Sequence, residues 1–98
     1  MNFSDLALRA EIVTAVAKLW YTEPTEVQAA VIPVALDGKN IIVQSNTGSG
    51  KTAAFVIPAL NRIDPKLRKP QVLILEPTRE LAMQTREEVM NLSRDMRM

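Results

Sequence analysis

The most informative stretch of the chain lies at residues 45–52 and reads Ser45-Asn46-Thr47-Gly48-Ser49-Gly50-Lys51-Thr52. It follows the phosphate-binding pattern of a glycine, four residues and Gly-Lys-Ser/Thr, except that Ser45 replaces the first glycine. Small residues allow successive backbone N–H groups to turn inward onto a polyphosphate, and Lys51 adds a positive charge. Thr52 offers a hydroxyl to Mg²⁺, and a helix beginning near Lys51 directs the positive end of its dipole at the phosphates.

The segments on either side of this loop predict a parallel α/β arrangement. Residues 41–43 and 72–75 are short apolar runs of the kind found in strands that are buried on both faces. A helix is expected from Lys51 to about Ile63, and another after its N-cap Thr78. The order strand, helix, strand, helix is typical of a parallel sheet. A loop placed between such a strand and a helix favours nucleotide binding over an ordinary glycine-rich turn.

Two helices are expected ahead of the first strand. Ser4 or Asp5 is the predicted N-cap of the first, which should run to about Trp20. Thr25 is expected to open the second, and Gly38 to end it with a left-handed C-terminal cap. We therefore divide the chain into a helical segment, residues 1–38, and a strand–helix–strand–helix unit, residues 39–98.

Composition excludes several kinds of chemistry. The 98 residues include no cysteine and no histidine, so disulfides, thiolate or imidazole metal sites and Ser-His-Asp catalysis are absent from this sequence. No apolar run approaches the roughly 20 residues that span a bilayer, and no secretory signal is visible, so we expect a cytoplasmic protein without a membrane partner. The net charge of +1 is uninformative about nucleic acid, although residues 62–98 carry eight basic and six acidic side chains.

Two further motifs flank the loop, and each also has a purely structural interpretation. The first reads Tyr21-Thr22-Glu23-Pro24-Thr25-Glu26-Val27-Gln28. In it, Thr25 and Gln28 have the spacing of a capping box, which would only close a helix end. The second reads Pro77-Thr78-Arg79-Glu80-Leu81-Ala82. It could be no more than an N-cap with a first-turn glutamate.

In this order and spacing, the three motifs resemble those of DEAD-box RNA helicases, and the resemblance covers essentially the whole chain. Phe3 lies 17 residues before Trp20, which matches the isolated upstream aromatic of that family. The resemblance implies a RecA-like, three-layer P-loop fold with parallel strands, ATP and Mg²⁺ as cofactors, and RNA, single-stranded or structured, as a partner. Two positions depart from the family pattern, because Trp20 stands in place of glycine and Ser45 in place of alanine.

The resemblance also implies roles for particular residues. Gln28 would hydrogen-bond the adenine edge, Tyr21 would pack against the base, and Phe3 would also belong to the cofactor-binding residues. The loop and the start of the next helix would hold the phosphates and Mg²⁺ through eight residues: Ser45, Thr47, Gly48, Ser49, Gly50, Lys51, Thr52 and Ala53. Of these, Lys51 and Thr52 would be the catalytic pair, and Thr52 would also be the metal ligand. The RNA backbone would be contacted by the motif after the second strand: Pro77, Thr78, Arg79 and Glu80.

Several parts of a complete helicase motor are not found in this sequence. The acidic Asp-Glu-Ala-Asp motif and the second RecA-like domain of the family lie outside it, and Glu87 and Glu88 are expected to face solvent on the last helix. We therefore expect about the first half of one RecA-like domain, without turnover of its own and with both strands lacking their partners. A complete small nucleotide-binding module and part of a P-loop ATPase that does not act on RNA remain open as alternatives.

Overall fold

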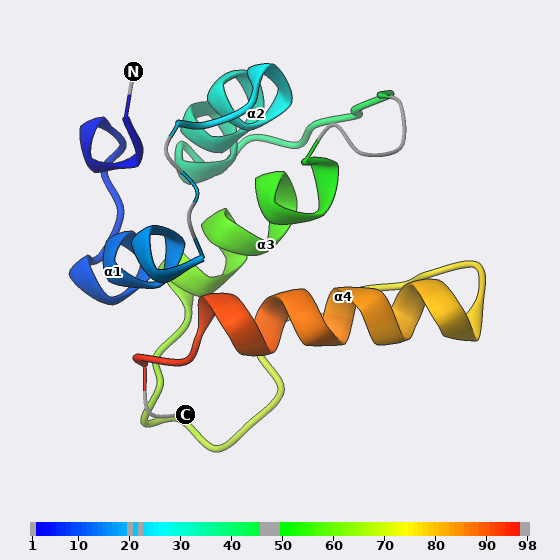
Figure 1. The fold of residues 1–98 in the computed structure, drawn as a ribbon. Helices are drawn as coiled ribbons and strands as arrows, with labels where there is room; N and C mark the ends of the chain where they lie inside the picture. The colour runs from blue at the N-terminus through cyan, green and yellow to red at the C-terminus, as the bar shows by residue number, and fades with distance from the viewer. Residues whose placement is uncertain (1, 20, 22, 46–49, 97–98) are drawn as a thin grey trace.

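A computed structural model describes residues 2–19, 21, 23–45 and 50–96, which form four α-helices and one short 3₁₀ helix (Figure 1). The elements follow one another along the chain as η1 (Phe3–Asp5), α1 (Ala10–Lys18), α2 (Glu26–Leu36), α3 (Lys51–Arg62) and α4 (Arg79–Leu92). The helix α3 lies centrally, against α2 on one side and against α4 and α1 on the other.

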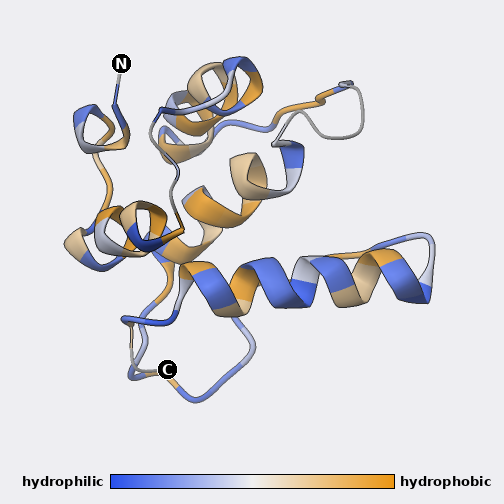
Figure 2. Cartoon of the chain, viewed as in Figure 1, coloured by the Kyte–Doolittle hydropathy of each residue, from blue (hydrophilic) through white to orange (hydrophobic). Residues whose placement is uncertain are grey.

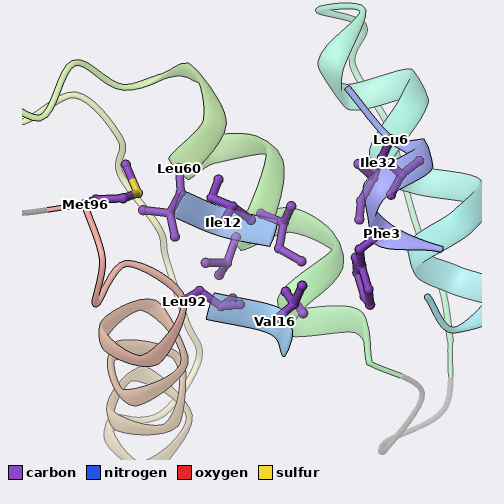
Figure 3. Close-up of a cluster of buried hydrophobic side chains, with 11 residues drawn as sticks. Phe3, Leu6, Ile12, Val16, Ile32, Leu60, Leu92 and Met96 are labelled. Atoms are coloured by element: carbon purple, nitrogen blue, oxygen red, sulfur yellow. The ribbon is translucent and has the colours of Figure 1, made fainter. Parts of the chain in front are cut away.

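The buried core gathers one apolar face from every element (Figure 3). Ile12 of α1, Ile32 of α2, Ile57 of α3 and Leu92 of α4 are each fully excluded from solvent. Phe3 of η1 joins the same cluster and is 4% exposed. Burial of such side chains stabilises a fold by about 1.5–3 kcal/mol each, so these contacts fix how the helices pack.

Three helix ends, two of α2 and one of α4, lie where local signals in the sequence predict. Thr25 is the N-cap of α2, and its hydroxyl accepts a hydrogen bond from the backbone of Gln28. Gly38 follows α2 with φ of 80°, which is the left-handed conformation expected there. Thr78 is the N-cap of α4, and its Oγ1 accepts a hydrogen bond from the backbone of Leu81.

The N-terminal prediction was wrong in detail. Ser4 and Asp5 do not cap α1; they belong to η1, where the Asn2 backbone donates to Asp5 Oδ2 at 2.8 Å. The α1 helix begins only at Ala10 and ends at Lys18. Local hydrogen bonding by Asp5 therefore competes with an earlier helix start, as short polar side chains often do. Trp20, the expected helix end, lies outside the described residues.

The predicted strands do not form: no β-strand is present among residues 2–19, 21, 23–45 and 50–96. Ile42 is 96% exposed, and Leu73 and Leu75 are 82% and 83% exposed, so these side chains are not buried as predicted. A strand requires a neighbouring strand to receive its backbone hydrogen bonds, and the two runs do not pair with each other. The three-layer sheet is therefore not confirmed, and the expectation that both runs lack their native strand partners stays a prediction.

Both extended runs nevertheless lead in the same direction. Figure 1 shows that the segment after α2 and the segment before α4 run toward the same side, where α3 and α4 begin. Apolar residues recur along both segments in Figure 2. The N-termini of the two helices that carry the phosphate loop and the second motif thus lie at one side of the molecule.

Arg9 and Lys18 make polar contacts between elements that are far apart in the sequence. The Arg9 guanidinium donates to the carbonyl oxygens of Asn61 and Ile63, at 3.1 and 2.8 Å, and so satisfies the C-terminal end of α3. Lys18 forms a 2.9 Å ion pair with Asp95, which joins α1 to the segment after α4. None of the helices in the described part of the chain is long and apolar enough to cross a membrane.

Candidate nucleotide and RNA sites

Gly50 links the phosphate loop to α3, and its backbone requires the absence of a side chain. Its φ of 83° lies in the left-handed region. A Cβ at this position would lie 2.6 Å from Gln28 Nε2 and 2.9 Å from Thr25 Oγ1. Both restrictions favour glycine, because a β-carbon would strain the backbone and overlap α2. Gly50 therefore packs directly against the start of α2.

Gln28 contacts the loop through its side-chain amide. Its Nε2 donates to the carbonyl oxygen of Gly50 at 3.2 Å, although the two residues are 22 apart in the sequence. Its Oε1 accepts from the Thr25 backbone at 3.0 Å, and the side chain is almost completely buried. The capping box is thus present, but it occupies only one side of the amide.

An amide has two N–H donors and two oxygen lone pairs, so these contacts leave Gln28 one donor and one acceptor. Its orientation is fixed, because Thr25 presents a donor to the oxygen and Gly50 presents an acceptor to the nitrogen. The remaining donor and acceptor therefore have a defined order, but the side chain is only 4% exposed, so a base edge would reach them only after a local movement. The capping and recognition roles of Gln28 are therefore compatible.

The start of α3 suits an anion. Gly50 is the N-cap residue of α3. Because it has no side chain, it provides no side-chain acceptor for the first backbone N–H groups of the helix. The first turn contains no acidic residue that would repel a phosphate. The exposed Lys51 lies at this end, and its Nζ donates to the Ser45 carbonyl at 3.4 Å, across the loop.

Thr52 and Ala53 follow in the first turn of α3 with different surroundings. Thr52 is half-buried, whereas Ala53 is 3% exposed and packs into the core, so its side chain is turned away from solvent. Thr47, Gly48 and Ser49 were also predicted to bind the phosphates, and these residues lie outside the described part of the chain.

The fit of the site to Mg²⁺ rests on one side-chain oxygen. Among the described residues, no group of three or more acidic side chains is arranged to hold a metal ion. Mg²⁺ commonly combines one or two protein oxygens with phosphate oxygens and water, so the Thr52 hydroxyl fits as a single ligand that acts together with a bound polyphosphate.

Tyr21 contacts residues of η1, α1 and α4. Its backbone N–H donates to Val16 at the end of α1, and its ring lies 6.4 Å from the ring of Phe3, centre to centre, at 31°. Its hydroxyl donates to Glu88 Oε1 on α4 at 2.9 Å. Burial, followed by the Glu88 hydrogen bond and charge, raises the pKa of Tyr21 to about 12, so the phenol stays neutral at physiological pH.

This contact corrects the expectation that both glutamates of α4 face solvent. Glu87 is exposed, but Glu88 is half-buried and accepts the Tyr21 hydrogen bond. Phe3 is also more enclosed than a residue stacked on a ligand would be, because it lies in the core behind Tyr21. Any contact between Phe3 and a base would therefore depend on movement, whereas Tyr21 is partly accessible.

The predicted RNA-contact motif occupies the exposed start of α4. Pro77, Thr78, Arg79 and Glu80 are all exposed, with Arg79 as the first helical residue. Just before them, Glu76 accepts a 2.7 Å hydrogen bond from the buried Thr85 hydroxyl, which holds the turn against α4. The Thr78 hydroxyl accepts from Leu81 and keeps its own proton for another acceptor, such as a phosphate oxygen.

Comparison with known proteins identifies the class to which this arrangement belongs. The DEAD/DEAH box helicase family matches residues 25–98, so the chain belongs to that family. The ATP-dependent RNA helicase DeaD of Klebsiella pneumoniae is 52% identical over 96 residues, which are 98% of this chain and 15% of that protein. The ATP-dependent RNA helicase DbpA of Bacillus subtilis is 48% identical over 93 residues, which are 95% of this chain and 19% of that protein.

Solved structures have a closely similar backbone. A DEAD box protein from Methanococcus jannaschii superposes with a TM-score of 0.88 at 41% identity, over 94% of this chain and 25% of that one. Dbp5 of Saccharomyces cerevisiae, in a structure bound to RNA and ADP BeF3, gives a TM-score of 0.94 at 35% identity, over 98% of this chain and 25% of that one. The resemblance drawn from the three motifs is thus confirmed, and the chain spans a small part of each relative's length.

Proposed function

We propose that this chain is the ATP- and RNA-binding portion of a DEAD-box RNA helicase. The observation that carries the proposal is the direct contact between Gln28 and Gly50, which joins the candidate base-recognition residue to the candidate phosphate loop. The structural likeness to a relative described as bound to RNA and ADP BeF3 supports it. Residues 1–38 would recognise the base, and residues 39–98 would bind the phosphates and RNA, as the sequence predicts.

In this proposal Gln28 selects adenine through its remaining donor and acceptor. The exocyclic amine and N7 of adenine present a donor beside an acceptor, whereas guanine presents two acceptors, O6 and N7, on the same edge. An amide that could turn over would present its donor and acceptor in either order, but Thr25 and Gly50 hold this one in a single orientation. Preference for ATP over GTP follows from that fixed orientation.

Lys51 would neutralise phosphate charge, and Thr52 would bind Mg²⁺ together with the phosphate oxygens. When bound, Mg²⁺ supplies further positive charge that lowers the cost of charge on the phosphates. Hydrolysis also requires an acidic metal partner and a group that orients water. We therefore propose binding without turnover for this chain, and a second RecA-like domain as the partner with which it would work.

Arg79 and the Thr78 hydroxyl would contact RNA through its phosphate backbone, so recognition at this end of α4 would not depend on sequence. The local positive charge of Arg79 explains how a chain of net charge +1 can bind a polyanion. A cytoplasmic location, as expected from the sequence, is part of the same proposal.

Competition and RNA-binding measurements test the proposal. ATP should displace a fluorescent ATP analogue from the chain at lower concentration than GTP, and Gln28→Ala, which loses both the donor and the acceptor of the amide, should remove most of this preference. Equal competition by ATP and GTP in the wild type would leave Gln28 as a capping residue only.

For RNA, Arg79→Ala should weaken retention of a single-stranded oligonucleotide more than Arg86→Ala. Arg86 is also exposed on α4, about 10 Å further along the helix, so both variants lose one positive charge from the same element. Equal retention by the two variants would contradict an RNA contact at the start of α4 and would favour a nucleotide-binding module that does not bind RNA.

A further inference from the structure

Glu88 makes a long-range contact with a residue of the candidate base site. It lies in the third turn of α4, is half-buried, and accepts a 2.9 Å hydrogen bond from the hydroxyl of Tyr21, 67 residues earlier. None of the three sequence motifs includes Glu88. Its neighbour Glu87 is exposed, so the two adjacent carboxylates have different surroundings on one helix.

The contact completes a three-point attachment of Tyr21. The backbone is held at the end of α1 by the 3.0 Å bond to Val16, and the ring is bordered by Phe3. Neither contact engages the far end of the ring, where the hydroxyl lies. A Tyr side chain can turn about two torsions, and the bond to Glu88 selects among the staggered positions that the first two contacts leave open.

The aromatic pair lies on the side of the molecule that carries Gln28. Phe3 shares the buried cluster with Ile32 of α2, and Figure 3 shows both side chains in that part of the core. Ile32 follows Gln28 by four residues, so the two side chains lie on the same face of α2, and both are almost fully buried. Tyr21 is thus linked, through the ring of Phe3, to the buried cluster that contains Ile32, one helical turn after Gln28 on α2.

We propose that Glu88 is a positioning residue for adenine-nucleotide binding, which acts by holding the Tyr21 ring in the orientation that packs against the base. The inference rests on the proposed ATP-binding function and extends it to a helix whose other candidate role concerns RNA. It assigns Glu88 no contact with the nucleotide. The effect of Glu88 is therefore specific to ligands that possess a base.

Two ligands and a set of matched variants test this inference on the full 98-residue chain. The ligands are Mg²⁺–ATP and Mg²⁺–tripolyphosphate, which has the phosphates but no base. Glu88→Ala should weaken ATP binding about three- to tenfold, the range expected for loss of one such hydrogen bond, and leave tripolyphosphate binding unchanged. Glu88→Gln should stay within about twofold of wild type, because its amide oxygen still accepts from Tyr21.

Two controls separate positioning from a structural role. Glu87→Ala removes the same charge from the same helix and should change neither affinity. In a Tyr21→Phe background, Glu88→Ala should have no further effect, because the hydroxyl is already absent. Ellipticity at equal concentration verifies that the variants remain equally helical.

Each other outcome overturns the inference in a recognisable way. If Glu88→Ala leaves ATP binding unchanged, or weakens ATP and tripolyphosphate equally, Glu88 does not position a base contact although the proposed function stands. If the wild type binds tripolyphosphate as tightly as it binds ATP, the base contributes no affinity, and both base recognition and the role of Glu88 are contradicted. If it binds neither ligand, the proposed function fails as well.

Discussion

Gln28 and Gly50 are in direct contact, with the side-chain Nε2 of Gln28 donating to the Gly50 carbonyl at 3.2 Å. The contact brings the start of α2 and the start of α3 together across 22 residues of sequence. The conformation of the phosphate loop at Gly50 is therefore linked to the residue that we propose recognises the base.

Gly50→Ala should destabilise the chain more than Gly38→Ala. Both glycines have positive φ, 83° and 80°, so alanine costs about 1–2 kcal/mol of backbone strain at either position. Only at Gly50 would the new Cβ also overlap neighbours, with Gln28 Nε2 at 2.6 Å, whereas at Gly38 the nearest atom lies 3.9 Å away on Arg62. Urea titrations followed by helical ellipticity should show a lower midpoint for Gly50→Ala, and equal midpoints would contradict this packing.

The helices, but not the strands, could be predicted from the sequence, and the reason is the range of the interactions involved. Thr25, Gly38 and Thr78 fix helix ends through contacts within a few residues, and the structure has them as expected. A strand depends on a partner that lies far away in the sequence, and residues 41–43 and 72–75 have none. Their apolar composition is typical of buried strands, but composition cannot supply the neighbouring strand, and the side chains are exposed.

In the candidate site, too, local contacts could be predicted from the sequence and long-range contacts could not. The loop pattern and the Thr25–Gln28 spacing indicated the members of the site, because both are local signals. The bond between Tyr21 and Glu88 had no such signal, since it joins residues 67 apart, one in the connection after α1 and the other on α4. A glutamate on a polar helix face is ordinarily solvated, so only the packing of α1 against α4 reveals its partner.

Exposed apolar residues in the extended segments should tolerate charge. Leu73→Lys and Leu75→Lys are expected to preserve the ellipticity of the chain, because both side chains are more than 80% exposed. By contrast, Ile57→Ala should cost about 2–5 kcal/mol, since Ile57 is fully buried on α3. If either lysine variant were destabilised as much as Ile57→Ala, residues 72–75 would have to be packed or paired, contrary to the structure.

Arg9→Ala should lower stability by about 1–2 kcal/mol, because two carbonyl groups at the end of α3 lose a charged donor. Arg9→Lys should recover only part of the loss, since an ammonium cannot reproduce the forked geometry of a guanidinium. Arg94→Ala, which removes an exposed arginine, serves as the control and should leave the urea midpoint near that of wild type. A midpoint for Arg9→Ala equal to that of Arg94→Ala would show that Arg9 does not support α3.

The single tyrosine provides a spectroscopic test of its contact with Glu88. Because folding raises the pKa of Tyr21 to about 12, above its ordinary value of about 10, its stabilising contribution is complete below pH 10 and is lost as the pH rises toward 12. Ultraviolet absorbance should therefore show tyrosinate forming near pH 12 in the wild type.

In Glu88→Ala the same titration should shift to lower pH without reaching the ordinary value, since burial, the largest cause of the raised pKa, remains. Glu87→Ala should titrate like the wild type. An identical titration in Glu88→Ala and wild type would show that the hydrogen bond is not formed in solution.

Nucleotide affinity tests the central claim most directly. With Mg²⁺ present, the wild-type chain should bind a fluorescent ATP analogue, and Lys51→Ala should bind it about tenfold more weakly or worse, because a charged contact to phosphate is lost. Lys39→Ala removes another exposed lysine and should bind like the wild type. Equally weak signals from the wild type and Lys51→Ala would contradict nucleotide binding at this loop.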